Sequence, residues 1–268
     1  MPIQEMLVFG SAMDDGNGSN RDISGKLVLV TGGGKRIGAE ICRILSISGA
    51  SIIVHAHRSI VESETLVEEI IEAGGEAELV LGDLSNEESR NSLINQILNT
   101  ELYQSVGGLD LLVNSASIFA KKMPGDDTQE FRKKMLEIHF EAPKHLINAF
   151  KETLSSRNGS VVNIIDALLE RSESGFEEYC ESKKHLANLT LEMAMELAPH
   201  VRVNGIGPGA IVASDEEESI VDKIANQVPL KRWGEMEDIA SAVLFLSNSP
   251  YITGQILNVD GGWSLSRS

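Results

Sequence analysis

Tyr179 and Lys183 are the residues whose types and spacing most directly indicate chemistry. They lie four residues apart in the segment Tyr-Cys-Glu-Ser-Lys, and on a helix this spacing places both side chains on one face. A lysine ammonium beside a phenol favours the phenolate and lowers the phenol pKa from its usual value of about 10. Such a tyrosine can give a proton to a carbonyl or imine as hydride arrives. A surface helix without a catalytic role can also carry this pair.

A glycine-rich turn near the N-terminus predicts a nucleotide-binding site. Residues 26–30 form a short apolar run typical of a buried strand, and the turn TGGGKRIG at residues 31–38 follows directly. A helix with apolar side chains at Ile41, Ile44 and Leu45 then runs to about residue 48. Glycines let the backbone approach a pyrophosphate, whose charge is attracted to the helix N-terminus. A plain strand-to-helix turn can have the same sequence.

The residues after the second predicted strand favour a cofactor with a 2′-phosphate. A site for NAD usually has Asp or Glu there to bind the adenosine ribose, but this chain has His57, Arg58 and Ser59. The planar guanidinium of arginine binds phosphate oxygens in pairs. Arg36 in the glycine turn adds a second guanidinium, so we expect NADP(H). We interpret His55 and His57 as ordinary strand-end residues.

Charge and composition exclude several classes of function. The chain has 268 residues, with 40 Asp and Glu against 23 Lys and Arg, and a net charge of −17. A field of that sign repels phosphate backbones and anionic membrane surfaces, so we expect neither nucleic acid nor a membrane as a partner. Cys42 and Cys180 have no metal-ligand neighbours, which predicts no metal site and fits a reducing, cytoplasmic compartment. The N-terminus lacks the basic region of a signal peptide.

Apolar runs and helical periodicity alternate along the chain. Strands are predicted at residues 26–30, 51–55, 77–81, 109–113, 160–165, 201–204 and 255–259. Further helices are predicted at residues 60–73, 86–104, 128–155 and 239–247, and around Tyr179 as far as residue 199. This alternation is typical of one α/β domain with a Rossmann-type, doubly wound parallel sheet. We expect that domain at residues 24–268, after a flexible leader at residues 1–23.

Residues 24–268 resemble the short-chain dehydrogenase/reductase family. The motifs in the family's order are the glycine turn, Gly82-Asp83-Leu84, Asn114-Ser115-Ala116, Tyr179/Lys183 and Pro208-Gly209. The resemblance implies that Asp83 bonds the adenine and that Asn114 steadies the fourth strand beside the cofactor. It also implies that Lys183 holds the nicotinamide ribose. The implied cofactor-binding residues are Gly32, Lys35, Arg36, Ile37, His57, Arg58, Ser59, Asp83, Leu84, Asn114, Ala116, Ser117, Lys183, Pro208 and Gly209.

Three positions depart from the usual pattern of this family. Arg36 replaces a glycine, Asp166 replaces the catalytic serine, and His139 replaces an asparagine. Arg36 and Asp166, together with residues 57–59, 207–209 and 259–267, resemble pteridine reductases, a subgroup that includes bacterial dihydromonapterin reductases. Phe119 sits where that subgroup has a stacking phenylalanine. His139 does not fit, and it leaves the usual water-mediated proton relay behind the lysine unsupported.

The residues and the resemblance together predict reduction of a pterin with NADPH. A serine hydroxyl donates to a ketone oxygen, whereas an ionised Asp166 only accepts, so it suits ring N–H or amino donors and can relay a proton with Tyr179. Phe119 would stack on a flat heterocycle. We expect a dihydropterin or dihydrofolate-like substrate, with Asp166, Tyr179 and Lys183 as the catalytic residues. The predicted substrate site consists of Arg36, Ser117, Phe119, Asp166 and Tyr179.

Two other functions stay open on the sequence alone. One is a carbonyl reductase of the 3-oxoacyl-carrier-protein type, and the other is a non-catalytic protein that senses NADP(H). Asp166 and His139 would suit such a sensor, but the intact Tyr179/Lys183 pair argues against it. Phe119 could instead pack onto its own loop, and Arg36 could bind cofactor phosphate alone.

The helix after Lys183 predicts an oligomer. Residues 186–197 (LANLTLEMAMEL) are apolar on more than one side, which is typical of a helix buried on two faces. With the resemblance, this predicts a homotetramer with long helices packed across a subunit interface, and with Arg267 near a neighbour's active site. Residues 210–232 correspond to the family's substrate lid, in which the acidic run at 215–218 is most simply a solvated face.

Overall fold

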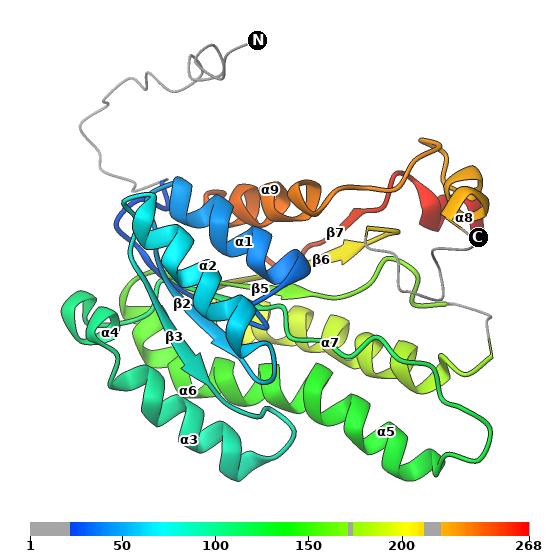
Figure 1. The fold of residues 1–268 in the computed structure, drawn as a ribbon, viewed down its shortest axis with the longest axis horizontal. Helices are drawn as coiled ribbons and strands as arrows, with labels where there is room; N and C mark the ends of the chain where they lie inside the picture. The colour runs from blue at the N-terminus through cyan, green and yellow to red at the C-terminus, as the bar shows by residue number, and fades with distance from the viewer. Residues whose placement is uncertain (1–21, 171–173, 212–220, 268) are drawn as a thin grey trace.

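One parallel sheet of seven strands organises the chain. The computed structural model describes residues 22–170, 174–211 and 221–267. The sheet has the order β3-β2-β1-β4-β5-β6-β7 and is covered by helices on both faces (Figure 1). Its strands are β1 (Leu27–Thr31), β2 (Ser51–Ala56), β3 (Ala77–Leu81), β4 (Leu111–Asn114), β5 (Ser160–Ile164), β6 (Arg202–Pro208) and β7 (Ile256–Val259). The predicted fold class is confirmed.

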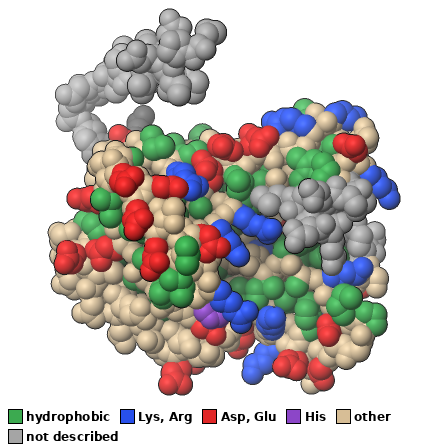
Figure 2. Space-filling view, in the orientation of Figure 1, with side chains coloured by type: hydrophobic (Ala, Val, Ile, Leu, Met, Phe, Trp, Pro, Cys, Tyr) green, Lys and Arg blue, Asp and Glu red, His purple; other side chains and the backbone are tan. Residues whose placement is uncertain are grey.

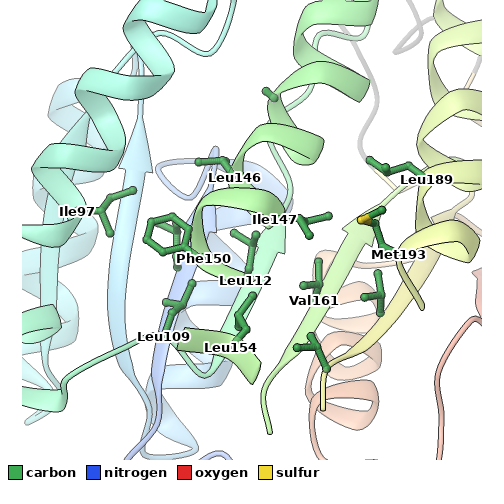
Figure 3. Close-up of a cluster of buried hydrophobic side chains, with 14 of the residues drawn as sticks. Ile97, Leu109, Leu112, Leu146, Ile147, Phe150, Leu154, Val161, Leu189 and Met193 are labelled. Carbon is green, nitrogen blue, oxygen red and sulfur yellow. The ribbon is translucent and has the colours of Figure 1, made fainter. Parts of the chain in front are cut away.

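The central strands are buried on both faces, as their continuous apolar runs predict. Successive side chains of β1 alternate between two cores: Leu27 and Leu29 face one, and Val28 and Val30 face the other. The first core, part of which is drawn in Figure 3, lies under α3 (Glu87–Leu98), α4 (Glu101–Val106), α6 (Ala142–Ser156) and α7 (Glu177–Glu196). The second lies under α1 (Arg36–Ile47), α2 (Ile60–Glu72) and α9 (Met236–Ser247). Both layers of helices therefore fix the strand ends that carry the predicted site.

The helix predicted at residues 86–104 is in fact two helices, α3 and α4. The hydroxyl of Thr100 accepts the Tyr103 N–H and caps the start of α4, while Asn99 ends α3. A threonine at this position starts a new helix because its side chain satisfies an N–H that has no carbonyl partner in the first turn. The fourth strand also differs from the prediction, since β4 begins at Leu111 and includes Asn114.

The helix predicted at residues 128–155 is interrupted by a π-helical turn. It consists of α5 (Thr128–Leu136), the turn η2 (Glu137–Glu141) and α6. Within η2 the Ala142 N–H donates to the Glu137 carbonyl, five residues back. Pro143 follows and has no N–H for the carbonyl of His139, so the regular hydrogen-bond ladder cannot continue through this point.

Two short elements were not predicted, α8 (Val221–Gln227) and the 3₁₀-helix η4 (Trp263–Arg267). In Figure 1 both elements lie beyond the carboxyl ends of β6 and β7. The predicted leader lies outside the described residues, and so does the acidic run at 215–218 that we interpret as a solvated face. The side chain of Arg267 is also outside them. Within the described ranges, no helix is both long enough and apolar enough to cross a bilayer.

Candidate active site

A cavity of about 950 Å³ opens at the carboxyl ends of the strands. The connections from β1 and β4 leave the sheet in opposite directions there, and this is where open α/β sheets bind ligands. In Figure 2, Lys and Arg side chains gather around the hollow in the middle of the molecule. The predicted site residues that line the cavity are Gly32, Lys35, Arg36, Ile37, His57, Arg58, Ser59, Asp83, Leu84, Ala116, Ser117, Phe119, Asp166, Tyr179, Lys183, Pro208 and Gly209.

Asn114 is the predicted site residue that does not line this cavity. Its side chain is buried, and its amide donates to Oδ1 of Asn163 over 2.8 Å. Asn163 in turn donates to the hydroxyl of Thr190 over 2.9 Å. Asn114 thus ties β4 to β5, and through Asn163 to α7, behind the cavity wall.

The glycine turn forms a cradle in which a side chain would not fit. Gly32 has a φ of 64°, and a Cβ atom there would lie 2.8 Å from Cα of Ala116. A Cβ on Gly38 would lie 2.1 Å from the carbonyl oxygen of Gly32. The N-terminus of α1 opens onto the turn and has no side-chain cap, so its free N–H groups can receive an anion. This geometry fits the pyrophosphate of a dinucleotide.

His55 links the glycine turn to the residue that follows β3. Its Nδ1 accepts the Gly32 N–H over 3.2 Å, and its Nε2 lies 3.1 Å from the Gly82 carbonyl, which needs a donor. The ring is therefore neutral with its proton on Nε2, and burial lowers its pKa to about 4. His55 is a positioning group within the fold, which the sequence did not reveal.

The end of β2 supplies positive charge beside Asp83. Nδ1 of His57 lies 3.8 Å from Asp83, whose carboxylate accepts the Ser85 N–H and hydroxyl at 2.9 and 2.6 Å. Burial alone would raise the pKa of Asp83, but these hydrogen bonds lower it. Within the described residues, Arg36 and Arg58 form no ion pair, so both guanidinium groups can bind phosphate.

Tyr179, Asp166 and Lys183 meet at the inner end of the cavity. The Tyr179 hydroxyl donates to Oδ2 of Asp166 over 2.9 Å, and Oδ1 of that carboxylate accepts the Leu168 N–H over 2.7 Å. Nζ of Lys183 donates to the Ile164 carbonyl over 2.9 Å and lies 6.0 Å from the centre of the Tyr179 ring. All three catalytic candidates are buried. A phenol bonded to a carboxylate, with a cation nearby, is suited to proton transfer.

Phe119 forms an aromatic wall beside Tyr179. Its ring meets the Tyr179 ring edge-on, with centres 5.2 Å apart, and stacks on Phe176 at 5.1 Å. The side chain is still 42% exposed, so it packs on its neighbours and also presents surface to the cavity.

Most of the chain matches the sequence of a known family. The model of a family described as enoyl-(acyl carrier protein) reductase matches residues 33–264. The chain belongs to the short-chain dehydrogenase/reductase family. The match covers the glycine turn from Gly33 onward and the Tyr179/Lys183 pair, which confirms the family resemblance.

Relatives of the chain carry names from several substrate classes, which include a sugar-acid dehydrogenase and a 7alpha-hydroxysteroid dehydrogenase at 30% identity. Pteridine reductase 1 of Leishmania tarentolae is 32% identical over an alignment of 281 positions that covers 90% of this chain and 97% of that protein. 3-Oxoacyl-(acyl-carrier-protein) reductase FabG of Aquifex aeolicus is 34% identical over 251 residues, which cover 90% and 98%. The solved structure of FolM alternative dihydrofolate reductase 1 from Brucella canis, complexed with NADP, has a TM-score of 0.82 and 32% identity, and the match covers 91% of this chain and 96% of that one.

Several cavity residues were not predicted from the sequence. Lys133 and Lys134 reach it from α5, and Trp233 and Trp263 from the C-terminal segments. Two adjacent lysines in a predicted helix give no signal of which cavity they face. No group of three or more His, Cys, Asp or Glu side chains among the described residues could hold a metal ion.

Proposed function

We propose that this reductase transfers hydride from NADPH to a C=N bond of a dihydropterin or a dihydrofolate-like ring. The observation that carries the proposal is the buried hydrogen bond from Tyr179 to Asp166, beside the exposed surface of Phe119. A carboxylate accepts hydrogen bonds and cannot donate one to a ketone oxygen. A pterin, in contrast, offers N–H and amino donors and a flat face.

The cavity has the groups needed to bind NADPH. The glycine cradle and the N-terminus of α1 would hold the pyrophosphate, and Arg36 and Arg58 the 2′-phosphate. Asp83 would face the adenine, and Lys183 the nicotinamide ribose. Two of the similar proteins, FolM from Brucella canis and a blue fluorescent protein from a metagenomic library, are described in complex with NADP and NADPH. When bound, NADPH supplies the hydride and becomes NADP⁺.

The side chains at the inner end would supply the proton. Reduction of C=N places hydride on carbon and a proton on nitrogen, giving CH–NH. Tyr179 would donate its hydroxyl proton to the ring nitrogen, directly or through Asp166, and would be reprotonated from solvent. Lys183 would keep positive charge next to the developing tyrosinate, and Phe119 would hold the ring flat by stacking.

A 3-oxoacyl reductase is the second candidate, favoured by the 34% identity to FabG from Aquifex aeolicus. That reaction needs a neutral donor for a ketone oxygen and a channel for a flexible acyl chain. Asp166 in place of a hydroxyl donor weighs against it.

The discriminating experiment follows loss of the NADPH absorbance band with a panel of dihydropterins, dihydrofolate and an acetoacetyl thioester. We expect turnover of the pteridine substrates and little with the thioester. Tyr179→Phe serves as the control for non-enzymatic oxidation. Brisk reduction of the thioester alone would replace the proposed substrate with the second candidate. NADPH binding without turnover of any compound would instead support a sensing role.

A further inference from the structure

His139 lies inside the π-helical turn η2. Its side chain is buried, although it stands where the family usually has asparagine. π-Helical turns are frequent at functional sites. Both ring nitrogens have hydrogen-bond partners on elements that border the active-site cavity, and these partners show what the residue does.

The hydrogen bonds of His139 determine its tautomer. The Ile118 N–H donates to Nε2 over 3.1 Å, and since a backbone N–H can only donate, Nε2 carries no proton. The Ser117 hydroxyl lies 3.0 Å from the same nitrogen. Nδ1 therefore carries the proton and donates to the Ser182 hydroxyl at 2.7 Å, which itself donates to the Tyr179 carbonyl at 2.7 Å. His139 is thus a neutral bridge between two walls of the site.

The surroundings favour this neutral form. Burial, and then the positive charge of Lys183, lower the pKa of His139 well below its usual value. A second proton on Nε2 would also face the Ile118 N–H, donor against donor. The bridge is therefore intact in the neutral form alone.

The two ends of the bridge carry the aromatic wall and the proton donor. One end holds residues 117 and 118, immediately before Phe119. The other end holds the turn of α7 that begins with Tyr179. The rings of His139 and Phe119 both meet the Tyr179 ring edge-on, with centres 5.5 and 5.2 Å away.

We propose that His139 is a positioning residue that sets the Ser117–Phe119 loop against the Tyr179 end of α7. It touches no substrate. It fixes the separation between the surface on which the substrate rests and the hydroxyl that protonates it. The amide of an asparagine would reach only as far as Nδ1 of the histidine, so it could not bond Ser182 and Ile118 at the same time. The inference rests on the proposed function only for the choice of substrate in the kinetics.

Two substitutions of His139 cut the bridge at opposite ends. His139→Asn keeps an amide near the position of Nδ1, within reach of Ser182, and releases Ile118. His139→Gln keeps an amide near the position of Nε2, within reach of Ile118, and releases Ser182. We expect the Asn variant to raise KM for a dihydropterin about tenfold with kcat within threefold. We expect the Gln variant to lower kcat about tenfold with little change in KM.

A readout without substrate tests the same inference. Hydrogen exchange of the Ile118 amide should be about tenfold faster in the Asn variant and unchanged in the Gln variant. NADPH affinity should stay within twofold in both. His145→Asn is the matched control, because His145 lies on α6 and contacts Asn91 of α3 through an exposed hydrogen bond, and it should change none of these quantities.

Ser182→Ala provides an independent route if the substitutions at His139 do not fold. It should reproduce the kinetics of His139→Gln, and the double variant should be no worse than either single one. Unchanged hydrogen exchange of the Ile118 amide in the Asn variant would overturn the positioning role. So would the same rise in KM, fall in kcat and fall in NADPH affinity in both His139 variants. If the wild type reduces only the acetoacetyl thioester, the proposed substrate is wrong. The kinetics are then run with the thioester, and the exchange result still decides the role of His139.

Discussion

The Tyr179 hydroxyl donates a hydrogen bond to the Asp166 carboxylate over 2.9 Å, and both side chains are buried. In this pair the proposed proton donor, Tyr179, faces a hydrogen-bond acceptor. A group that needs a donor, such as a ketone oxygen, would have to compete with Asp166 for one hydroxyl proton. A substrate with its own N–H groups would satisfy Asp166 and free the proton of Tyr179.

Asp166→Ser should reverse the preference for a substrate with its own N–H groups over a ketone. A hydrogen bond to a charged group contributes about 1.5–3 kcal/mol, so we expect kcat/KM for a dihydropterin to fall at least tenfold. Activity with an acetoacetyl thioester should stay level or rise. Asp166→Asn keeps the size of the side chain and is the control for the loss of volume in Asp166→Ser. Steady-state rates that remain at wild-type level with the dihydropterin would show that the carboxylate has no part in recognition.

Tyr179→Phe should abolish most turnover but leave the fold intact. The change removes the proton donor and keeps the ring that contacts Phe119 and His139. Loss of a general acid typically lowers the rate 10²–10⁴-fold. NADPH binding, followed by fluorescence titration, should be retained. Near-normal kcat in this variant would mean that another group donates the proton.

The cofactor preference should depend on Arg58. With Arg36 and Arg58 unpaired among the described residues, we expect kcat/KM for NADPH to exceed that for NADH by more than tenfold. Arg58→Ala should reduce the ratio several-fold without loss of maximal rate, since Arg58 is exposed and solvent would partly screen its attraction for a cofactor phosphate. Arg43→Ala, on the outer face of α1 with Glu69 as its partner, is the control. Equal efficiency of the two cofactors in the wild type would contradict the prediction.

Activity should fall as pH rises through about 8. Burial lowers the pKa of the Lys183 ammonium to about 8, although the charge of Asp166 works against this shift. If the ammonium holds the cofactor ribose, kcat/KM for NADPH decreases as it loses its proton. A Lys183→Arg variant, whose guanidinium stays charged, should have a lower rate but no such decrease.

Unfolding would not explain this decrease. The pKa of Lys183 is about 8 in the folded chain against 10.5 for the ordinary group. Between these values the unfolded chain binds more protons, so this residue makes the free energy of unfolding rise with pH. Melting temperatures measured over the same range serve as the control. A wild-type profile that stays flat to pH 9 would exclude a role for the Lys183 charge.

We propose that the chain forms a homotetramer through the outer side of α7. Leu191 and Met195, one turn apart, are 45% and 83% exposed, whereas Leu189 and Met193 are buried in the core. Met195→Glu should yield a smaller species by light scattering. Ile47→Glu on α1, with the same 83% exposure, should keep the wild-type mass. A wild-type monomer at micromolar concentration would refute the proposal.

The fold could be predicted because the central strands β1 and β4 are apolar runs followed directly by a turn or polar residues, and because such runs alternate with helical periodicity along the chain. The errors arise where one side chain or one missing N–H ends a regular pattern. Thr100 starts a new helix although apolar residues continue on both sides of it. Pro143 permits a helix to continue but changes the hydrogen bonding before it.

The site could be predicted where it lies at strand ends, because parallel strands bring their carboxyl ends together. Contacts between distant elements could not be predicted. The side chain of Asn114 points along the sheet to Asn163 rather than into the cavity, and Lys133 and Lys134 enter it because α5 packs against α7. For His139, the sequence showed the departure but not its partners.

Arg36 has a φ of 53°, a backbone conformation that glycine adopts freely and arginine does not. A non-glycine residue held there costs about 1–3 kcal/mol. Selection for heat resistance alone would therefore favour glycine at this position. The same step would remove one of the two guanidinium groups available to the cofactor. Laboratory evolution of a thermostable variant should include a screen for cofactor choice, because at residue 36 resistance to heat and discrimination between nucleotides are opposed.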